Sequence, residues 1–186
     1  MAAKAGVFAA LFGAGVQLAF AQAAPPTTEP TRPAITEDLG SSVPDAKAVR
    51  EGLFPEDKCA DAQRDKFICM GGIKPSTTFS LPAVAFALGS AILPDSLKRQ
   101  LDVFAEVLSS KRGSTQTVRI IGHADTTGTA AGNAALSQRR ADEVKRYLVG
   151  KGADSAMLVT QGVGSRELLK PDAPTSPDNR RVTLGR

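Results

Sequence analysis

Residues 78–186 of this 186-residue chain show regular alternation of apolar and polar positions. Apolar, β-branched runs bounded by Gly, Pro or Asp predict four strands, at 79–88, 117–121, 158–163 and 180–184. Apolar residues spaced three and four apart predict two helices, at 95–108 and 133–150. The order β-α-β-α-β-β predicts an α+β domain at 78–186, with two helices packed on one face of a small mixed sheet.

The first 23 residues have the pattern of an export signal. Lys4 is the only charge before Glu29, the segment after it is apolar, and two small-x-small cleavage sites end at Ala21 and Ala23. The alternative is an uncleaved membrane anchor, since the apolar stretch is close to the lower limit for spanning a bilayer. No cysteine follows the cleavage sites, so we expect no lipid anchor there. Export predicts a periplasmic or cell-envelope location, with an outer-membrane association as one variant.

Between the signal and the domain, the sequence predicts little regular structure. Residues 24–36 are rich in Pro and Thr and are typical of a stiff linker. Residues 37–77 are interpreted as a small, mostly irregular appendage with one short helix near 57–67. In an exported protein, Cys59 and Cys69 are expected to form a disulfide; the alternative is two free thiols.

Composition excludes several classes of function. The net charge of +4 is too small and too dispersed to indicate nucleic-acid binding. One His and two Cys are too few for a structural zinc site, and nothing in the sequence predicts a metal or another cofactor. The 54 residues between the signal and residue 78 are too few for a transmembrane barrel of eight strands, so we expect none in this chain.

The second predicted helix contains an anomaly. Its inward stripe is apolar but includes Asn133 and Arg140, and a buried Arg is costly unless it meets an anion. Asp125 follows the second strand in a glycine-bounded loop, a usual place for a binding site. One alternative is a buried Asp125–Arg140 salt bridge, with Asn133 capping the helix. The other is a pocket that binds a zwitterion, with the amine on Asp125 and the carboxylate on Arg140.

Two further polar positions need an interpretation. His123 is the only His, but no nucleophile or metal accompanies it, so we interpret it as a hydrogen-bonded core residue. Arg180 and Arg181 begin the last strand. Either they are solvated charges, or one of them connects this strand to the loop after Asp125.

These residues together carry a family resemblance. The first motif is Ile121-Gly122-His123-Ala124-Asp125-x-x-Gly128, and the second runs from Asn133 through Leu136-Ser137-x-x-Arg140-Ala141 to Gly152. Gly162-x-Gly164, Asn179-Arg180-Arg181-Val182 and the segment Phe86–Pro94 follow the same pattern. Over about 109 residues, the chain resembles the OmpA-like peptidoglycan-binding domain, whose fold is also β-α-β-α-β-β.

The resemblance implies non-covalent binding of the peptide stems of peptidoglycan. The family's Asp and Arg hold the amine and carboxylate of diaminopimelate, and they correspond to Asp125 and Arg140. The helix-start Asn corresponds to Asn133, and the Gly-Ser turn to Gly89 and Ser90; Arg180 is the last candidate ligand residue. Ala124 stands where the family usually has Thr, which removes one hydroxyl near the ligand.

Three functions compete at this point. The first is a module that tethers the envelope to peptidoglycan. The second is an interaction subunit of an envelope complex, in which residues 24–77 bind a partner protein and wall binding is secondary. The third is a wall hydrolase, which is disfavoured because no carboxylate other than Asp125 lies in a motif loop. We therefore expect a binding protein and not an enzyme.

Overall fold

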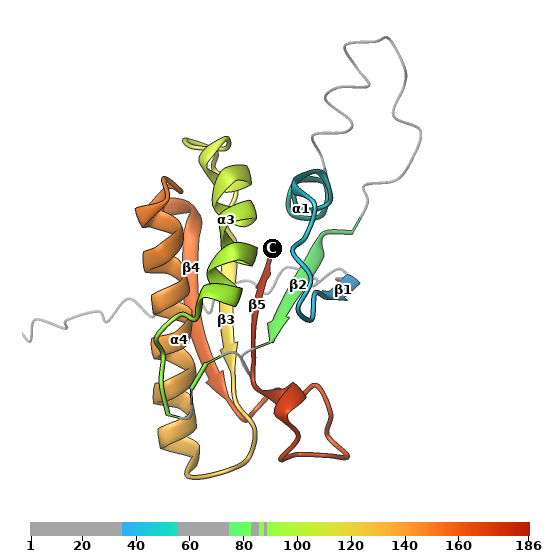
Figure 1. The fold of residues 1–186 in the computed structure, drawn as a ribbon, viewed down its shortest axis with the longest axis vertical. Helices are drawn as coiled ribbons and strands as arrows, with labels where there is room; N and C mark the ends of the chain where they lie inside the picture. The colour runs from blue at the N-terminus through green and yellow to red at the C-terminus, as the bar shows by residue number, and fades with distance from the viewer. Residues whose placement is uncertain (1–34, 56–74, 83–85, 88) are drawn as a thin grey trace, which may run out of the picture. The chain divides into compact units, whose positions relative to one another are not determined.

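The structure, a computed structural model, describes residues 35–55, 75–82, 86–87 and 89–186, and these form one mixed sheet with three α-helices (Figure 1). The sheet order is β1-β2-β5-β3-β4. The central strand β5 is antiparallel to both β2 and β3, while β1 is parallel to β2 and β4 is parallel to β3. The strands are β1 (Ile35–Asp38), β2 (Thr77–Pro82), β3 (Val118–His123), β4 (Leu158–Gly164) and β5 (Arg181–Gly185).

The α-helices lie together on the viewer's side of the sheet in Figure 1. They are α1 (Ala46–Leu53), α3 (Asp95–Ser109) and α4 (Ala130–Gly150), and two 3₁₀ turns, η2 (Ser155–Met157) and η3 (Pro177–Asn179), precede β4 and β5. Helix α4 packs on β3 and β4, and α3 lies between α1 and α4. The predicted α+β class, with four strands and two helices in the order β-α-β-α-β-β, is confirmed, and β1 and α1 are added to it.

Three phenylalanines are fully buried between the helices and the sheet. Phe79 of β2 and Phe104 of α3 meet edge to face, with their ring centroids 5.4 Å apart. Phe54 follows α1 and is also fully buried. Burial of each such ring contributes roughly 1.5–3 kcal/mol to folding, so the three rings connect α1, α3 and β2 into one core.

Part of the upstream region belongs to this core, which corrects the expectation of a separate appendage beginning at residue 37. Val49 and Leu53 on one side of α1, together with Leu39 and Phe54, are buried with the residues of α3 and β2. The side chain of Asp45 caps α1 by accepting hydrogen bonds from the backbone N–H groups of the helix's first turn. The core therefore does not begin at residue 78.

Two predicted elements differ from the structure by three residues or more at one end. The first predicted strand, 79–88, corresponds to β2, which ends at Pro82, where the backbone has no N–H to continue the ladder. The second predicted helix begins three residues early, at Ala130, because the hydroxyl of Thr129 accepts a hydrogen bond from the N–H of Gly132 and acts as the N-cap. Asn133 is therefore not the cap.

Helix α4 approaches the sheet so closely that two strand positions have no room for a side chain. A Cβ at Gly122 would lie 2.1 Å from the carbonyl oxygen of Ser137, and one at Gly162 would lie 2.3 Å from the amide nitrogen of Gln138. The backbones of β3, β4 and α4 are thereby in direct contact. This contact fixes the first half of α4 relative to the end of β3, where the candidate site lies.

Several expectations fall on residues that the structure does not describe. The signal at 1–23, most of the linker at 24–36, the short helix at 57–67 and both Cys59 and Cys69 lie outside the described residues. In the described part of the chain, no helix is long and apolar enough to cross a membrane.

Candidate functional site

Asp125 lies two residues beyond the end of β3, and its carboxylate is nearly buried. Its Oδ2 accepts a hydrogen bond from Nη1 of Arg180 at 2.6 Å, and its Oδ1 accepts one from the backbone N–H of Thr127 at 2.9 Å. Only 7% of the Asp125 side chain is exposed, against 34% of Arg180. Burial alone would raise the pKa of Asp125, but the hydrogen bonds from Arg180 and Thr127 outweigh it and lower the pKa below its usual value.

Arg180 is the partner of Asp125, so the structural alternative of an Asp125–Arg140 salt bridge was wrong. Among the described residues, the only ion pair that involves Asp125 is the one with Arg180. The hypothesis that an arginine at the start of the last strand connects it to the loop after Asp125 is confirmed for Arg180. Arg181 instead donates to the carbonyl oxygen of Glu167.

Arg140 lies in the buried stripe of α4, as predicted, and is 3% exposed. Its Nε donates to the carbonyl oxygen of Ser90 at 3.0 Å, and its guanidinium carbon lies 4.9 Å from the centroid of the Phe86 ring. Burial lowers the pKa of Arg140 from its ordinary value, the charge of Arg180 lowers it further, and Asp125 acts in the opposite direction. The guanidinium is thus held by a carbonyl and an aromatic face.

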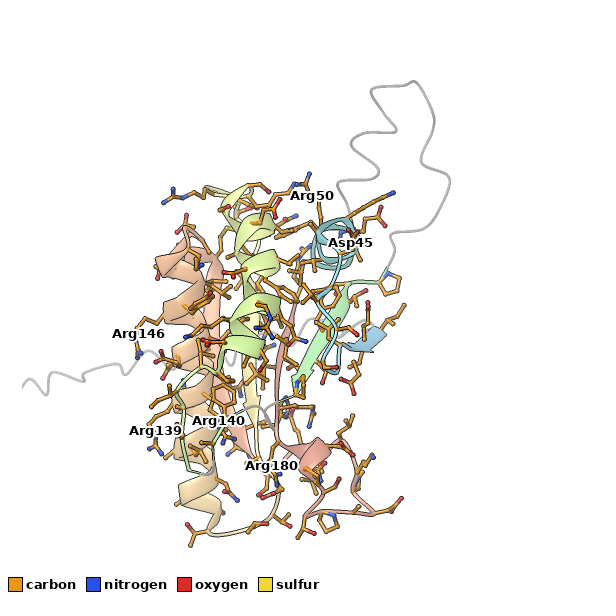
Figure 2. All side chains as sticks on the ribbon, viewed as in Figure 1. Asp45, Arg50, Arg139, Arg140, Arg146 and Arg180 are labelled. Atoms are coloured by element: carbon orange, nitrogen blue, oxygen red, sulfur yellow. The ribbon has the colours of Figure 1, made fainter. Side chains whose placement is uncertain are left out.

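The labelled side chains in Figure 2 separate the two faces of α4. Arg139 and Arg146 project outward, whereas Arg140 lies on the side toward Arg180. Arg139 is exposed, unlike its neighbour Arg140. The helix therefore offers a matched pair of adjacent arginines, one in the site and one outside it.

Asn133 and the segment at Ser90 position the two charged groups. The side-chain amide of Asn133 donates to the carbonyl oxygens of Asp125 at 2.9 Å and Thr127 at 3.0 Å, and this holds the loop after β3 against α4. Gly89 has a φ of +68°, in the left-handed region that favours glycine, and its turn directs the Ser90 carbonyl to Arg140. Asn133 thus contacts the loop of Asp125, and the turn at Gly89 and Ser90 contacts Arg140.

The sequence reasoning missed a buried hydroxyl that connects these parts. Ser137 is fully buried, and its Oγ accepts a hydrogen bond from the N–H of Gly164 at 2.9 Å. The carbonyl oxygen of Gly164 in turn accepts a hydrogen bond from the N–H of Ala124 at 2.8 Å. Ser137 lies in the middle of the buried face of α4, and this position in the helical pattern could have predicted its burial.

His123 is a core residue, as predicted, and is 3% exposed. Its Nδ1 lies 3.2 Å from the carbonyl oxygen of Glu167, and its Nε2 lies 3.3 Å from the hydroxyl oxygen of Thr183. Burial, reinforced by the charge of Arg181, lowers its pKa from 6.5 to about 4. The imidazole is therefore neutral at pH 7.

The chemical capacity of the site is that of charge recognition. One carboxylate and two guanidiniums lie at one end of the sheet, on segments fixed by hydrogen bonds, and such groups bind carboxylates and amines. Within the described ranges, no group of three His, Cys, Asp or Glu side chains is arranged to hold a metal ion.

Comparison with known proteins agrees with this architecture. The chain is 39% identical over 101 residues to the peptidoglycan-associated lipoprotein of Pseudomonas aeruginosa, which covers 53% of this chain and 58% of that protein. It is 40% identical over 86 residues to the peptidoglycan-associated lipoprotein of Haemophilus influenzae, covering 45% and 55%. The matches thus span little more than half the length of these lipoproteins.

Solved structures share the fold. The crystal structure of a MotB-like protein from Desulfovibrio vulgaris superimposes with a TM-score of 0.50 at 28% identity, covering 59% of this chain and 74% of that chain. The family model described as the OmpA family matches residues 85–182, a range that includes Asp125, helix α4 with Arg140, and Arg180. The chain therefore belongs to the OmpA family.

Proposed function

We propose that this protein binds peptidoglycan non-covalently and thereby tethers or organises the cell envelope. The observation that carries the proposal is the pair of nearly buried charges, Asp125 and Arg140, on the rigid junction of β3 and α4. The relatives named peptidoglycan-associated lipoproteins support it, and the region that matches the OmpA family model contains this junction. A location in the cell envelope is part of the same proposal.

The proposed ligand group is the zwitterionic end of diaminopimelate in a peptide stem. Its ammonium would bind Asp125, and its carboxylate would bind the guanidinium of Arg140. At Asp125, Arg180 takes the place that this ammonium needs, so we infer that ligand binding displaces Arg180 or shares the carboxylate with it. Arg180 is one-third exposed, whereas Arg140 is buried and held by Ser90 and Phe86.

We also propose that the protein binds peptidoglycan without cleaving it. Asp125 has a lowered pKa and a guanidinium partner, so it is ionised at neutral pH and is unsuited to act as a general acid. His123 is enclosed by backbone and hydroxyl partners. Incubation of the full chain with purified sacculi should release no soluble fragments, and measurable release would contradict this part.

Co-sedimentation with purified sacculi tests the binding itself. Asp125→Ala and Arg140→Ala should each weaken binding by roughly ten- to a hundred-fold, because each removes one charge-assisted contact. The exposed neighbour provides the control, and Arg139→Ala should bind like the wild type. Free diaminopimelate should compete with sacculi for the wild-type protein.

Thermal melting of the same variants separates a ligand role from a structural one. If Asp125→Ala is folded and sediments normally with sacculi, Asp125 is not a ligand group. If both site variants melt early but their folded fraction binds normally, the two charges serve the fold alone.

The alternative role, recruitment of a partner by residues 24–77, has less support. Part of that segment, β1 and α1, is used to complete the sheet and the core. It would remain the better proposal if the wild-type chain failed to sediment with sacculi.

A further inference from the structure

Asn179 is a fully buried polar residue that lies next to Arg180 but outside the proposed ligand contacts. It ends the 3₁₀ turn η3, just before β5. Its Oδ1 accepts a hydrogen bond from the backbone N–H of Lys170 at 2.8 Å, and its Nδ2 donates to the carbonyl oxygens of Ala173 at 2.9 Å and Pro174 at 3.2 Å. One side chain therefore closes the loop between β4 and β5 onto the residue that precedes Arg180.

The closed loop in turn supports the loop that carries Asp125. The carbonyl oxygen of Pro174 accepts a hydrogen bond from the backbone N–H of Thr126 at 3.1 Å, in addition to the bond from Asn179. Arg180, the residue after Asn179, pairs with Asp125 at 2.6 Å. Two separate contacts to the Asp125 loop thus come from residues that Asn179 holds in place.

The Arg140 side of the site is held independently. Arg140 lies on α4, where its Nε donates to the carbonyl oxygen of Ser90 and its guanidinium faces the ring of Phe86. Neither of these contacts involves the loop that Asn179 closes. A change at Asn179 should therefore reach Asp125 and leave Arg140 in its place.

We propose that Asn179 is a positioning residue that determines how well the site recognises the amine of its ligand. By fixing Pro174 and Arg180, Asn179 holds the Asp125 carboxylate in the orientation that an ammonium group needs, although Asn179 itself touches no ligand. Such supporting hydrogen bonds behind a binding group keep it in its productive geometry. The inference rests on the proposed function, because that function assigns the amine to Asp125.

Two ligands that differ only in their amines test the proposal. Pimelate has the carbon chain and both carboxylates of diaminopimelate but no amino group. Each ligand is titrated into the full chain at pH 7 and followed by NMR. Asn179→Ala should weaken diaminopimelate binding about tenfold, the usual effect of losing one charge-assisted contact, and should leave pimelate binding within about twofold of the wild type. A purely structural role would weaken the binding of both ligands by the same factor, and this result would overturn the proposal.

The neighbouring residue provides the matched control. Asp178 is 47% exposed, and its ion pair with Lys170 ties the same loop at the surface. Asp178→Asn should therefore bind both ligands as the wild type does. A selective loss of diaminopimelate binding in Asp178→Asn as large as that in Asn179→Ala would show that any change in this loop has the effect, and it would reject the specific role of Asn179.

A measurement on the wild-type chain decides the point if Asn179→Ala does not fold. Saturating diaminopimelate should slow hydrogen exchange of the Thr126 N–H and of the Asn179 side-chain amide, because occupation of Asp125 tightens the contacts behind it. Saturating pimelate should leave both exchange rates unchanged. Equal protection by the two ligands would overturn the positioning role.

One further variant separates this inference from the proposed function. If Asp125→Asn binds diaminopimelate as tightly as the wild type does, the amine site itself is rejected, and the positioning role with it. If Asp125→Asn weakens diaminopimelate binding selectively and Asn179→Ala does not, the proposed function is supported and only the role of Asn179 is rejected.

Discussion

Asp125 forms its ion pair with Arg180 at 2.6 Å, although Arg140 is the arginine that the helical pattern places in the buried stripe. The pair joins residues 55 positions apart, one after β3 and one before β5. Arg140 forms no ion pair among the described residues, so its buried positive charge favours an anionic group. The arrangement also explains why Arg180 lowers the pKa of Arg140.

Removal of this pair should destabilise the protein in a pH-dependent way. Asp125 has a lowered pKa, so its contribution to stability is present above its unfolded pKa and is lost as the pH falls through its folded pKa. Arg180→Gln should cost about 1–2 kcal/mol at pH 7, a range that allows for the partial exposure of Arg180. Urea unfolding at pH 7 and pH 3 checks this: the difference between wild type and variant should shrink at pH 3.

His123 should make the folded state less stable in mildly acidic solution. Its folded pKa of about 4 lies below its unfolded value of 6.5. Between these two values the imidazole is protonated in the unfolded chain and neutral in the folded chain, which favours unfolding. The free energy of unfolding should fall by about 2 kcal/mol between pH 7 and pH 5. In His123→Gln this part of the pH dependence should disappear, and an identical slope in both proteins would contradict the assignment.

The sequence predicted the four strands and two helices of residues 78–186 because their apolar positions repeat with a clear period. It did not predict β1 and α1. β1 is a four-residue edge strand whose residues are all exposed, and α1 has only eight residues, so neither leaves a strong pattern. Their place in the fold depends on pairing with β2 and packing against α3, which are long-range contacts.

The site was predicted in part for a similar reason. Asp125, Asn133 and Arg140 could be brought together because a loop and the following helix are local in sequence. The partner of Asp125 could not be chosen, because Arg140 and Arg180 are equivalent as charges and only the tertiary fold decides between them. Ser137 lies at the centre of the buried face of α4, and Leu136 lies at the edge of that face. The reason is that Gly122 and Gly162 have no side chains, so the backbone of α4 contacts the sheet at Ser137.

The contact between α4 and the sheet gives a sharp stability prediction. Gly122→Ala would place a Cβ 2.1 Å from the Ser137 carbonyl oxygen, which is backbone and cannot rotate away. We expect a loss of at least about 1–3 kcal/mol and weaker sacculus binding, since α4 carries Arg140. Gly150→Ala, with nothing within 4 Å of the new Cβ, is the matched control and should be neutral or slightly stabilising. Melting temperatures of the two variants decide the point.

Phe54 tests whether the upstream segment is part of the domain. It follows α1, is fully buried, and lies in one core with residues of α3 and β2. Phe54→Ala should therefore lower the free energy of unfolding by about 3–5 kcal/mol, the usual cost of removing a buried aromatic ring. Val43→Ala changes a side chain of the same segment that is 53% exposed, and it should have little effect. Urea unfolding of both variants measures the difference. If Phe54→Ala unfolds like Val43→Ala, residues 37–55 are a dispensable appendage and the domain begins near residue 78 after all.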